Sequence, residues 1–140
     1  MQTIVTHSEE ETFAVAERLG QSLTPGAFVL LHGKLGAGKT VFVRGLAAGL
    51  GADADAVTSP TFVLIQQYKG PTPLIHADLY RLESSAAVED LGLEELGNGA
   101  VVAVEWAERM SRPPEGSITV TIEDASGDTR KITIGKREEG

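Results

Sequence analysis

The chain has 140 residues, 41% of them hydrophobic and 23% charged, which is typical of a globular protein with one principal core. Its formal net charge of −8 disfavours direct binding to nucleic acid, because such binding needs clustered Lys and Arg side chains. The absence of cysteine excludes disulfides, thiolate zinc sites and a cysteine nucleophile. The sequence contains neither an apolar stretch of about 18 residues nor a signal-peptide pattern, so we expect a cytoplasmic protein that does not contact a membrane.

The first element expected in chain order is a helix that follows Ser8. The run Ser8-Glu9-Glu10-Glu11 has the capping-box pattern of a helix N-terminus. Three apolar residues then recur on one face: Phe13, Ala16 and Leu19. Gly20 and the proline at position 25 predict the end of this helix.

A strand, a glycine-rich turn and a second helix are expected next. Residues 27–31 form an unbroken apolar run, which is typical of a strand buried on both faces of a largely parallel sheet. From Lys39 onward, apolar residues recur at helical spacing up to Gly51, which we expect at the C-terminal cap: Phe42, Leu46 and Leu50. This order is the one that a phosphate-binding site requires.

The second half of the chain predicts a mixed sheet. Residues 61–68 and 73–79 are rich in strand-favouring residues, and the turn at 69–72 joins them into an antiparallel pair. Ser85 is expected to cap a helix that ends at residues 97–99 and carries Val88, Leu91 and Leu96. The apolar run at 100–104 predicts another buried strand, which ends at Glu105, and the segments 118–123 and 130–134 predict a terminal hairpin around Ser126-Gly127-Asp128.

The turn after the first buried strand reads Gly33-Lys34-Leu35-Gly36-Ala37-Gly38-Lys39-Thr40, the G-x-x-x-x-G-K-[ST] pattern of a P-loop, or Walker A motif. Its glycines let successive backbone N–H groups face an anion at the N-terminus of the next helix. We expect Lys39 to bridge the outer phosphates of ATP, the Thr40 hydroxyl to bind Mg²⁺ and the Val41 N–H to reach the inner phosphate. The expected loop contacts to ATP are Gly33, Gly36, Ala37, Gly38, Lys39, Thr40 and Val41.

Two strand-end carboxylates are candidates for the metal and for the attacking water. Glu105 ends the more uniformly apolar run, so we assign it to Mg²⁺, either directly or through water. Asp78 is assigned to positioning the water or to the second metal shell, although both residues could also be solvated strand-end acids. His76 is interpreted as a core histidine and Trp106 as a packing aromatic beside the site. The hydroxyls of the 58–61 turn, Thr61 included, either sense the outer phosphate or cap a turn, and their residue types favour neither.

These motifs together resemble the bacterial TsaE (YjeE) family over nearly the whole chain. The matching segments are Gly33 to Thr40, Ser59-Pro60-Thr61, His76-Ala77-Asp78-Leu79-Tyr80-Arg81 and Glu105-Trp106. The resemblance implies an ATPase subunit of the machinery that installs threonylcarbamoyl on adenosine 37 of tRNAs (t6A), acting with TsaB-like and TsaD-like proteins. Contact with tRNA is then expected only through that complex.

The resemblance also implies roles for single residues. Thr40 and Glu105 hold Mg²⁺, Asp78 supports hydrolysis together with Lys39, and Thr61 lies in a switch-like segment. Glu9 and Gly127 are implied to approach the adenine. Lys34 departs from the family pattern, which usually has an acid at this position, but the position is free in the general loop pattern.

The expected fold is a P-loop NTPase-like, three-layer α/β fold with a mixed, mostly parallel central sheet and a C-terminal β-hairpin. We expect a single ATPase domain over residues 1–135 and a frayed tail over 136–140. The expected function is Mg²⁺-dependent ATP hydrolysis, weak alone and stimulated by partners. The alternatives are a small P-loop kinase and an assembly factor that acts by binding ATP; a regulatory GTPase is disfavoured because no Asn-Lys-x-Asp string is present.

Overall fold

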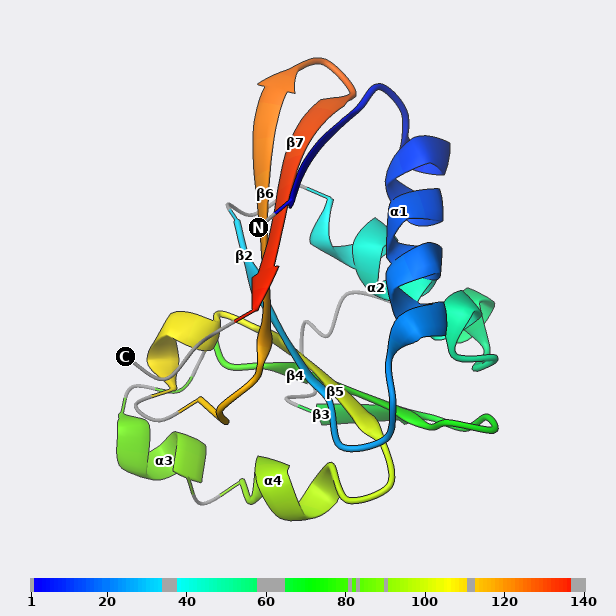
Figure 1. Ribbon diagram of the computed structural model, residues 1–140. Helices are drawn as coiled ribbons and strands as arrows, with labels where there is room; N and C mark the ends of the chain where they lie inside the picture. Colours follow the sequence, from blue (N-terminus) through cyan, green and yellow to red (C-terminus); the bar gives the residue numbers. More distant parts are fainter. Residues whose placement is uncertain are drawn as a thin grey trace.

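The computed structural model describes residues 2–33, 38–57, 65–80, 82, 84–89, 91–110 and 113–136. Within these ranges, seven strands form one sheet in the order β1-β7-β6-β2-β5-β4-β3 (Figure 1). The strands are β1 (Gln2–Thr6), β2 (Phe28–His32), β3 (Ile65–Tyr68), β4 (Leu74–Asp78), β5 (Val101–Glu105), β6 (Ile118–Ser126) and β7 (Thr129–Lys136). The helices are α1 (Glu9–Ser22), α2 (Lys39–Gly49), α3 (Ser85–Glu89) and α4 (Leu93–Leu96), with 3-10 turns η1 (Ala54–Ala56) and η2 (Ala107–Arg109).

The sheet is mixed, as the sequence predicts. The four central strands, β6, β2, β5 and β4, run parallel to one another. The outer pairings, β1 with β7, β7 with β6, and β4 with β3, are antiparallel. Parallel pairing is therefore confined to the centre of the sheet, and the expected terminal hairpin is formed by β6 and β7.

Helices cover both faces of the sheet, which gives three layers. Helices α1 and α2 lie on one face, and α3 and α4 lie on the other (Figure 1). Strand β2 supplies both cores: Val29 and Leu31 pack beneath α1 and α2, whereas Phe28 and Leu30 face the opposite layer. The unbroken apolar run is thus explained by burial on both faces.

Helix α1 begins as predicted but ends later. The Ser8 side chain accepts a hydrogen bond from the Glu11 N–H at 3.1 Å, which confirms the N-terminal cap. The helix continues past Gly20 to Ser22, because Gly20 faces α2 rather than ending the helix. A Cβ at Gly20 would lie 2.6 Å from the Leu46 carbonyl oxygen, so the glycine permits close contact between the two helices.

The single helix expected after Ser85 is divided into two. Helix α3 ends at Glu89, and α4 begins after Gly92, whose φ of 65° is left-handed and interrupts the helical backbone. Ser85, which was expected to cap the helix, is instead the first residue of α3, and the Ser84 Oγ accepts from the Ala87 N–H at 3.1 Å. None of the helices in the described ranges has the length and apolarity needed to cross a membrane.

The two ends of the chain also differ from expectation. Residues 2–6, for which no element was predicted, form strand β1 and pair with β7, so that Ile4 lies opposite Ile132. At the other end, Lys136 still belongs to β7 and is not part of a tail. Residues 137–140 lie outside the described ranges.

Candidate functional site

Two of the predicted catalytic side chains, Lys39 and Asp78, meet the predicted metal ligand Glu105 at one edge of the sheet. Strands β2, β5 and β4 are parallel neighbours, so their carboxyl ends lie together. Asp78 lies directly opposite Glu105 in the β4–β5 register. Because side chains alternate along a strand, both residues lie on the face that packs against α2.

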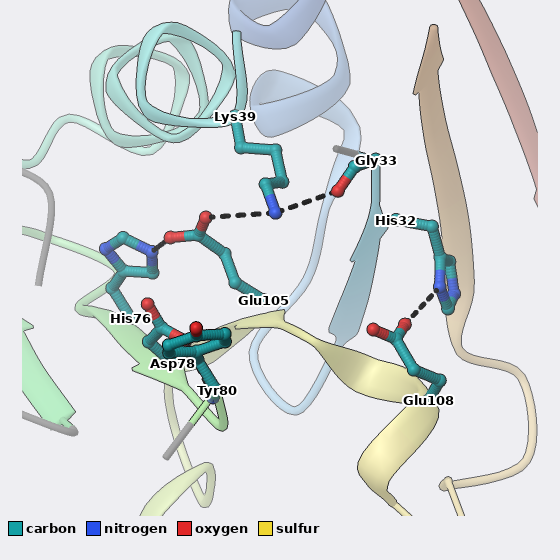
Figure 2. A network of polar contacts seen from close by, with 8 residues as sticks. All are labelled: His32, Gly33, Lys39, His76, Asp78, Tyr80, Glu105 and Glu108. Atoms are coloured by element: carbon teal, nitrogen blue, oxygen red, sulfur yellow. Dashed lines mark hydrogen bonds and ion pairs between the residues drawn. The ribbon is translucent and has the colours of Figure 1, made fainter. Parts of the chain in front are cut away.

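Lys39, the first residue of α2, reaches into this edge (Figure 2). Its Nζ donates to the Gly33 carbonyl oxygen at 3.0 Å and lies 3.9 Å from Glu105 Oε1. The centroid of the Trp106 ring is 5.1 Å from the same nitrogen. Only 5% of Lys39 is exposed, so a carbonyl, a carboxylate and an aromatic face together stabilise its buried charge.

The N-terminus of α2 lacks a side-chain cap. Its N-cap is Gly38, with a left-handed φ of 105°, and no acidic residue lies in the first turn. The first-turn N–H groups of an α-helix have no partner within the helix. Thr40 and Val41 lie in this turn, which therefore suits an anion such as a phosphate.

Glu105 is held between two nitrogen groups. It is 6% exposed, and its Oε2 lies 2.5 Å from His76 Nε2, while Oε1 faces Lys39 (Figure 2). His76 has no exposed surface. The interpretation of His76 as a core residue is correct for its burial, but its ring also contacts a predicted metal ligand.

Asp78 occupies a more open position than Glu105. One oxygen, Oδ1, accepts from the Tyr80 backbone N–H at 2.9 Å. Burial raises the pKa of the Asp78 carboxyl above its usual range, and the charge of Glu105 acts in the same direction. The Tyr80 N–H, His76 and Lys39 oppose this rise.

Two aromatic side chains form the rim beside Asp78. The rings of Tyr80 and Trp106 have centroids 4.9 Å apart, and Tyr80 is 57% exposed. Trp106 has φ 59°, the sole positive φ of a non-glycine residue within the described ranges, and it directly follows Glu105. A bulky residue held in this strained conformation is typical of functional sites.

A second part of the candidate site lies between α1, α2 and the β6–β7 turn. A cavity of about 60 Å³ is lined by Glu9, Thr12, Gly38, Val41, Asp128 and Arg130. Gly127 is next to Asp128, and its carbonyl accepts from Arg130 Nη1 at 2.7 Å. The fold thus brings the two residues expected near adenine, Glu9 and Gly127, toward the start of α2.

The predicted site residues therefore fall into three groups. Gly33, Lys39, Asp78 and Glu105 converge at the edge of the sheet. Glu9, Gly38 and Val41 line the cavity, Gly127 lies beside it, and Thr40 is in the first turn of α2. The remaining three, Gly36, Ala37 and Thr61, lie outside the described residues. The ligand roles of all of them stay predictions.

The donor set is compatible with Mg²⁺ bound together with a nucleotide. Mg²⁺ prefers hard oxygen ligands and is usually held by one or two protein groups plus phosphate oxygens. The Thr40 hydroxyl and the Glu105 carboxylate are ligands of this type. No group of three or more His, Cys, Asp or Glu residues suited to a metal occurs in the described part of the chain.

Arg130 was not predicted from the sequence to lie near the candidate site. Its Nε pairs with Asp124 Oδ1 at 3.0 Å and would lie 3.8 Å from a Cβ built on Gly38, so the guanidinium lies beside the N-cap of α2. Two other arginines make contacts elsewhere: Arg44 donates to the Val57 carbonyl and Arg109 to the Leu82 carbonyl. Arg81 lies outside the described ranges. The position of Arg130 depends on where the β6–β7 hairpin lies relative to the start of α2, for which the sequence carries no local signal.

Comparison with known proteins assigns the family. The family model described as "Threonylcarbamoyl adenosine biosynthesis protein TsaE" matches residues 6–132. The chain belongs to the TsaE family. The match spans every strand and helix of the candidate site, from α1 to the β6–β7 turn.

Individual relatives agree with this assignment. The tRNA threonylcarbamoyladenosine biosynthesis protein TsaE of Treponema pallidum is 40% identical over 132 residues, covering 93% of this chain and 97% of the relative. The TsaE protein of Bacillus subtilis is 42% identical over 140 residues, covering 96% and 87%. The crystal structure of Bacillus subtilis YdiB superposes with a TM-score of 0.74 at 36% identity, covering 95% of this chain and 83% of that one. The α/β fold expected from the sequence is thereby confirmed.

Proposed function

We propose that this chain binds ATP and Mg²⁺ at the carboxyl ends of β2 and β5 and hydrolyses ATP as a subunit of the t6A biosynthesis machinery. The observation that carries the proposal is the position of Lys39. Its ammonium lies at the start of α2, 3.0 Å from the Gly33 carbonyl and 3.9 Å from Glu105. A cation at an uncapped helix N-terminus, beside a buried carboxylate, is the arrangement that phosphates and Mg²⁺ require.

The residues would divide the binding as follows. The N–H groups at the start of α2 and Lys39 bind the phosphates, and Thr40 and Glu105 supply oxygens to Mg²⁺. When bound, Mg²⁺ would neutralise charge on the phosphate oxygens. The cavity between Glu9 and Arg130 is proposed to receive the adenosine end of the nucleotide, since it opens beside Gly38 and Val41.

Asp78 is proposed to orient the attacking water and accept its proton. A carboxylate that performs general-base work is most effective when its pKa approaches the working pH. Burial and the nearby Glu105 raise the pKa of Asp78 in that direction. Its Oδ1 bond to the Tyr80 N–H also fixes the carboxylate at the rim rather than beside Lys39.

Partner proteins are proposed to complete the site. Tyr80 is an exposed aromatic residue next to Asp78 and Trp106, and aromatic residues are enriched at protein interfaces. The net charge of −8 disfavours direct contact with tRNA. We therefore propose that TsaB-like and TsaD-like proteins bind this rim, stimulate slow ATP turnover and provide the contact with tRNA.

The test measures binding and turnover separately. Calorimetric titrations with ATP, ADP and GTP in Mg²⁺ should show binding of the adenine nucleotides. ATP turnover should be slow for the isolated chain and faster with TsaB-like and TsaD-like proteins of the same organism. Turnover that the partners leave unchanged, combined with phosphorylation of a small molecule, would favour the kinase alternative.

Thermodynamic linkage gives a stricter form of the same test. If ATP tightens the complex with the partners, the partners must tighten ATP binding by the same factor. We expect both affinities to change when a non-hydrolysable ATP analogue and the partners are combined. If neither affinity changes, nucleotide binding and complex formation are independent and the proposed coupling is wrong.

A further inference from the structure

His76 lies in the core and contacts the carboxylate assigned to Mg²⁺. The residue has no exposed surface, and its Nε2 is 2.5 Å from Glu105 Oε2 (Figure 2). Its other ring nitrogen, Nδ1, is also buried and has no hydrogen-bond partner within the described part of the chain. One ring nitrogen of His76 is therefore hydrogen-bonded and the other is not.

The unused nitrogen argues against a packing role alone. A buried polar atom without a partner is unfavourable, and an apolar side chain of similar size would fill the same space without that cost. The sheet provides the space, because His76 lies opposite the small Ala103 on β5. What a histidine adds at this position is an N–H directed at Glu105.

The proposed role of Glu105 determines which ring nitrogen should carry the proton. A carboxylate that serves as a Mg²⁺ ligand accepts hydrogen bonds and does not donate them, so this role requires Nε2 to be the donor to Oε2. Nδ1 is then the unprotonated nitrogen, which agrees with its lack of an acceptor nearby. The geometry thus fits the Nε2–H form of the ring.

We propose that His76 is a positioning residue that fixes Glu105 Oε2 through its Nε2–H, so that Oε1 stays directed toward Lys39 and the Mg²⁺ site. The inference rests on the proposed function, because it assumes that Glu105 serves Mg²⁺. In this proposal His76 acts only through Glu105. Hydrogen-bond partners of this kind orient ligating carboxylates, and their loss typically weakens metal binding by about 10–100-fold.

Three substitutions separate positioning from packing. In His76→Gln, the side-chain amide reaches about as far as Nε2 and can still donate to Glu105. In His76→Asn, the shorter amide ends near the place of Nδ1 and cannot reach Glu105. His76→Leu fills the core without any donor. The Gln and Asn variants are matched controls for each other, since both carry an amide, placed near Nε2 in the Gln variant and near Nδ1 in the Asn variant.

The measurement is the affinity for ADP by calorimetry, with Mg²⁺ and with a chelator. We expect His76→Gln to keep most of the Mg²⁺-dependent gain in affinity, and His76→Asn and His76→Leu to lose about tenfold or more of it. Affinity in the chelator should stay the same in all three. A full Mg²⁺-dependent gain in His76→Leu, or equal losses in the Gln and Leu variants, would overturn the inference.

Glu105→Gln distinguishes this inference from the proposed function. If Glu105→Gln removes the Mg²⁺-dependent gain in ADP affinity and His76→Leu does not, only the role of His76 is wrong. If Glu105→Gln leaves the gain unchanged, the assignment of Glu105 to Mg²⁺ is wrong and the role of His76 is overturned with it.

A second measurement needs no variant at position 76. Nitrogen-15 NMR of labelled histidine should show one ring with a protonated Nε2 and a bare Nδ1 in the folded protein. The signal is assigned by elimination, with His7→Gln and His32→Gln removing the other two histidines. A protonated Nδ1 with a bare Nε2 would contradict the proposed donor and overturn the inference.

Discussion

Two carboxylates end neighbouring strands of this sheet, and their surroundings are very different. Asp78 ends β4 and Glu105 ends β5, in direct register and on the face that packs against α2. Glu105 is 6% exposed and lies between His76 and Lys39. Asp78 is partly exposed and is bonded through Oδ1 to the Tyr80 N–H.

The difference supports the proposal that the two carboxylates have separate chemical roles. A carboxylate with both oxygens oriented by neighbours suits a fixed ligand position, as Mg²⁺ requires. A carboxylate at a partly open rim, with a raised pKa, suits proton transfer to and from water. Pairs of carboxylates whose environments differ in this way commonly divide the work of one site.

Replacing Asp78 should have the largest effect. Asp78→Asn removes the proton acceptor, so we expect ATP turnover to fall by about 10²–10⁴-fold, the usual contribution of a general base. ATP affinity should remain close to that of the unaltered chain, because the phosphates are assigned to Lys39 and the start of α2. Turnover is measured as phosphate release in the presence of the partners, and affinity by calorimetry.

Glu105→Gln is the matched variant for this comparison, because it also exchanges a carboxylate for an amide of the same shape. It should weaken ATP binding in Mg²⁺ and leave binding in a chelator unchanged. If Asp78→Asn and Glu105→Gln gave the same losses in binding and in turnover, the two strand ends would not have separate roles.

Replacing Lys39 should have the next largest effect. Lys39→Ala removes the cation that lies between the Gly33 carbonyl and Glu105, and each charge-assisted contact to phosphate is worth about 1.5–3 kcal/mol. We expect ATP affinity to fall by about a hundredfold, measured by calorimetry at constant salt. Lys69→Ala is the control, since Lys69 is exposed in the turn between β3 and β4. Its replacement changes the net charge by the same amount as Lys39→Ala. Equal affinities for the two variants would contradict the P-loop assignment.

The features predicted correctly from the sequence have local signals. The Ser8 cap and the apolar runs of β2 and β5 each lie within about ten residues, and the two strands of the terminal hairpin follow one another directly in the sequence. The strand-end positions of Asp78 and Glu105 follow from the lengths of these runs.

The features that were missed depend on contacts between distant segments. Strand β1 forms because residues 2–6 pair with β7, more than 120 residues away, and its mostly exposed residues give only a weak strand pattern. The bond from His76 to Glu105 exists only in the β4–β5 register. The break between α3 and α4 depends on the left-handed backbone of Gly92, which helical spacing does not reveal.

The smallest expected effect is a pH dependence of stability at Asp78. Burial raises the pKa of this carboxyl in the folded state above its value in the unfolded state. Its contribution to folding is then fully present below the unfolded pKa and is lost as the pH rises through the folded pKa. The unaltered chain should therefore lose this stability between acid and neutral pH, whereas Asp78→Asn, which cannot ionise, should not.

The measurement is urea unfolding of both proteins at several pH values, without nucleotide or Mg²⁺, because either ligand would add its own binding energy to the folded state. The free energy of unfolding of Asp78→Asn should exceed that of the unaltered chain by a small amount under acid conditions and by a larger amount toward neutral pH. A constant difference would mean that the bond from the Tyr80 N–H and the attraction of Lys39 offset the burial of the carboxylate. The contrast between the two strand ends would then rest on exposure alone.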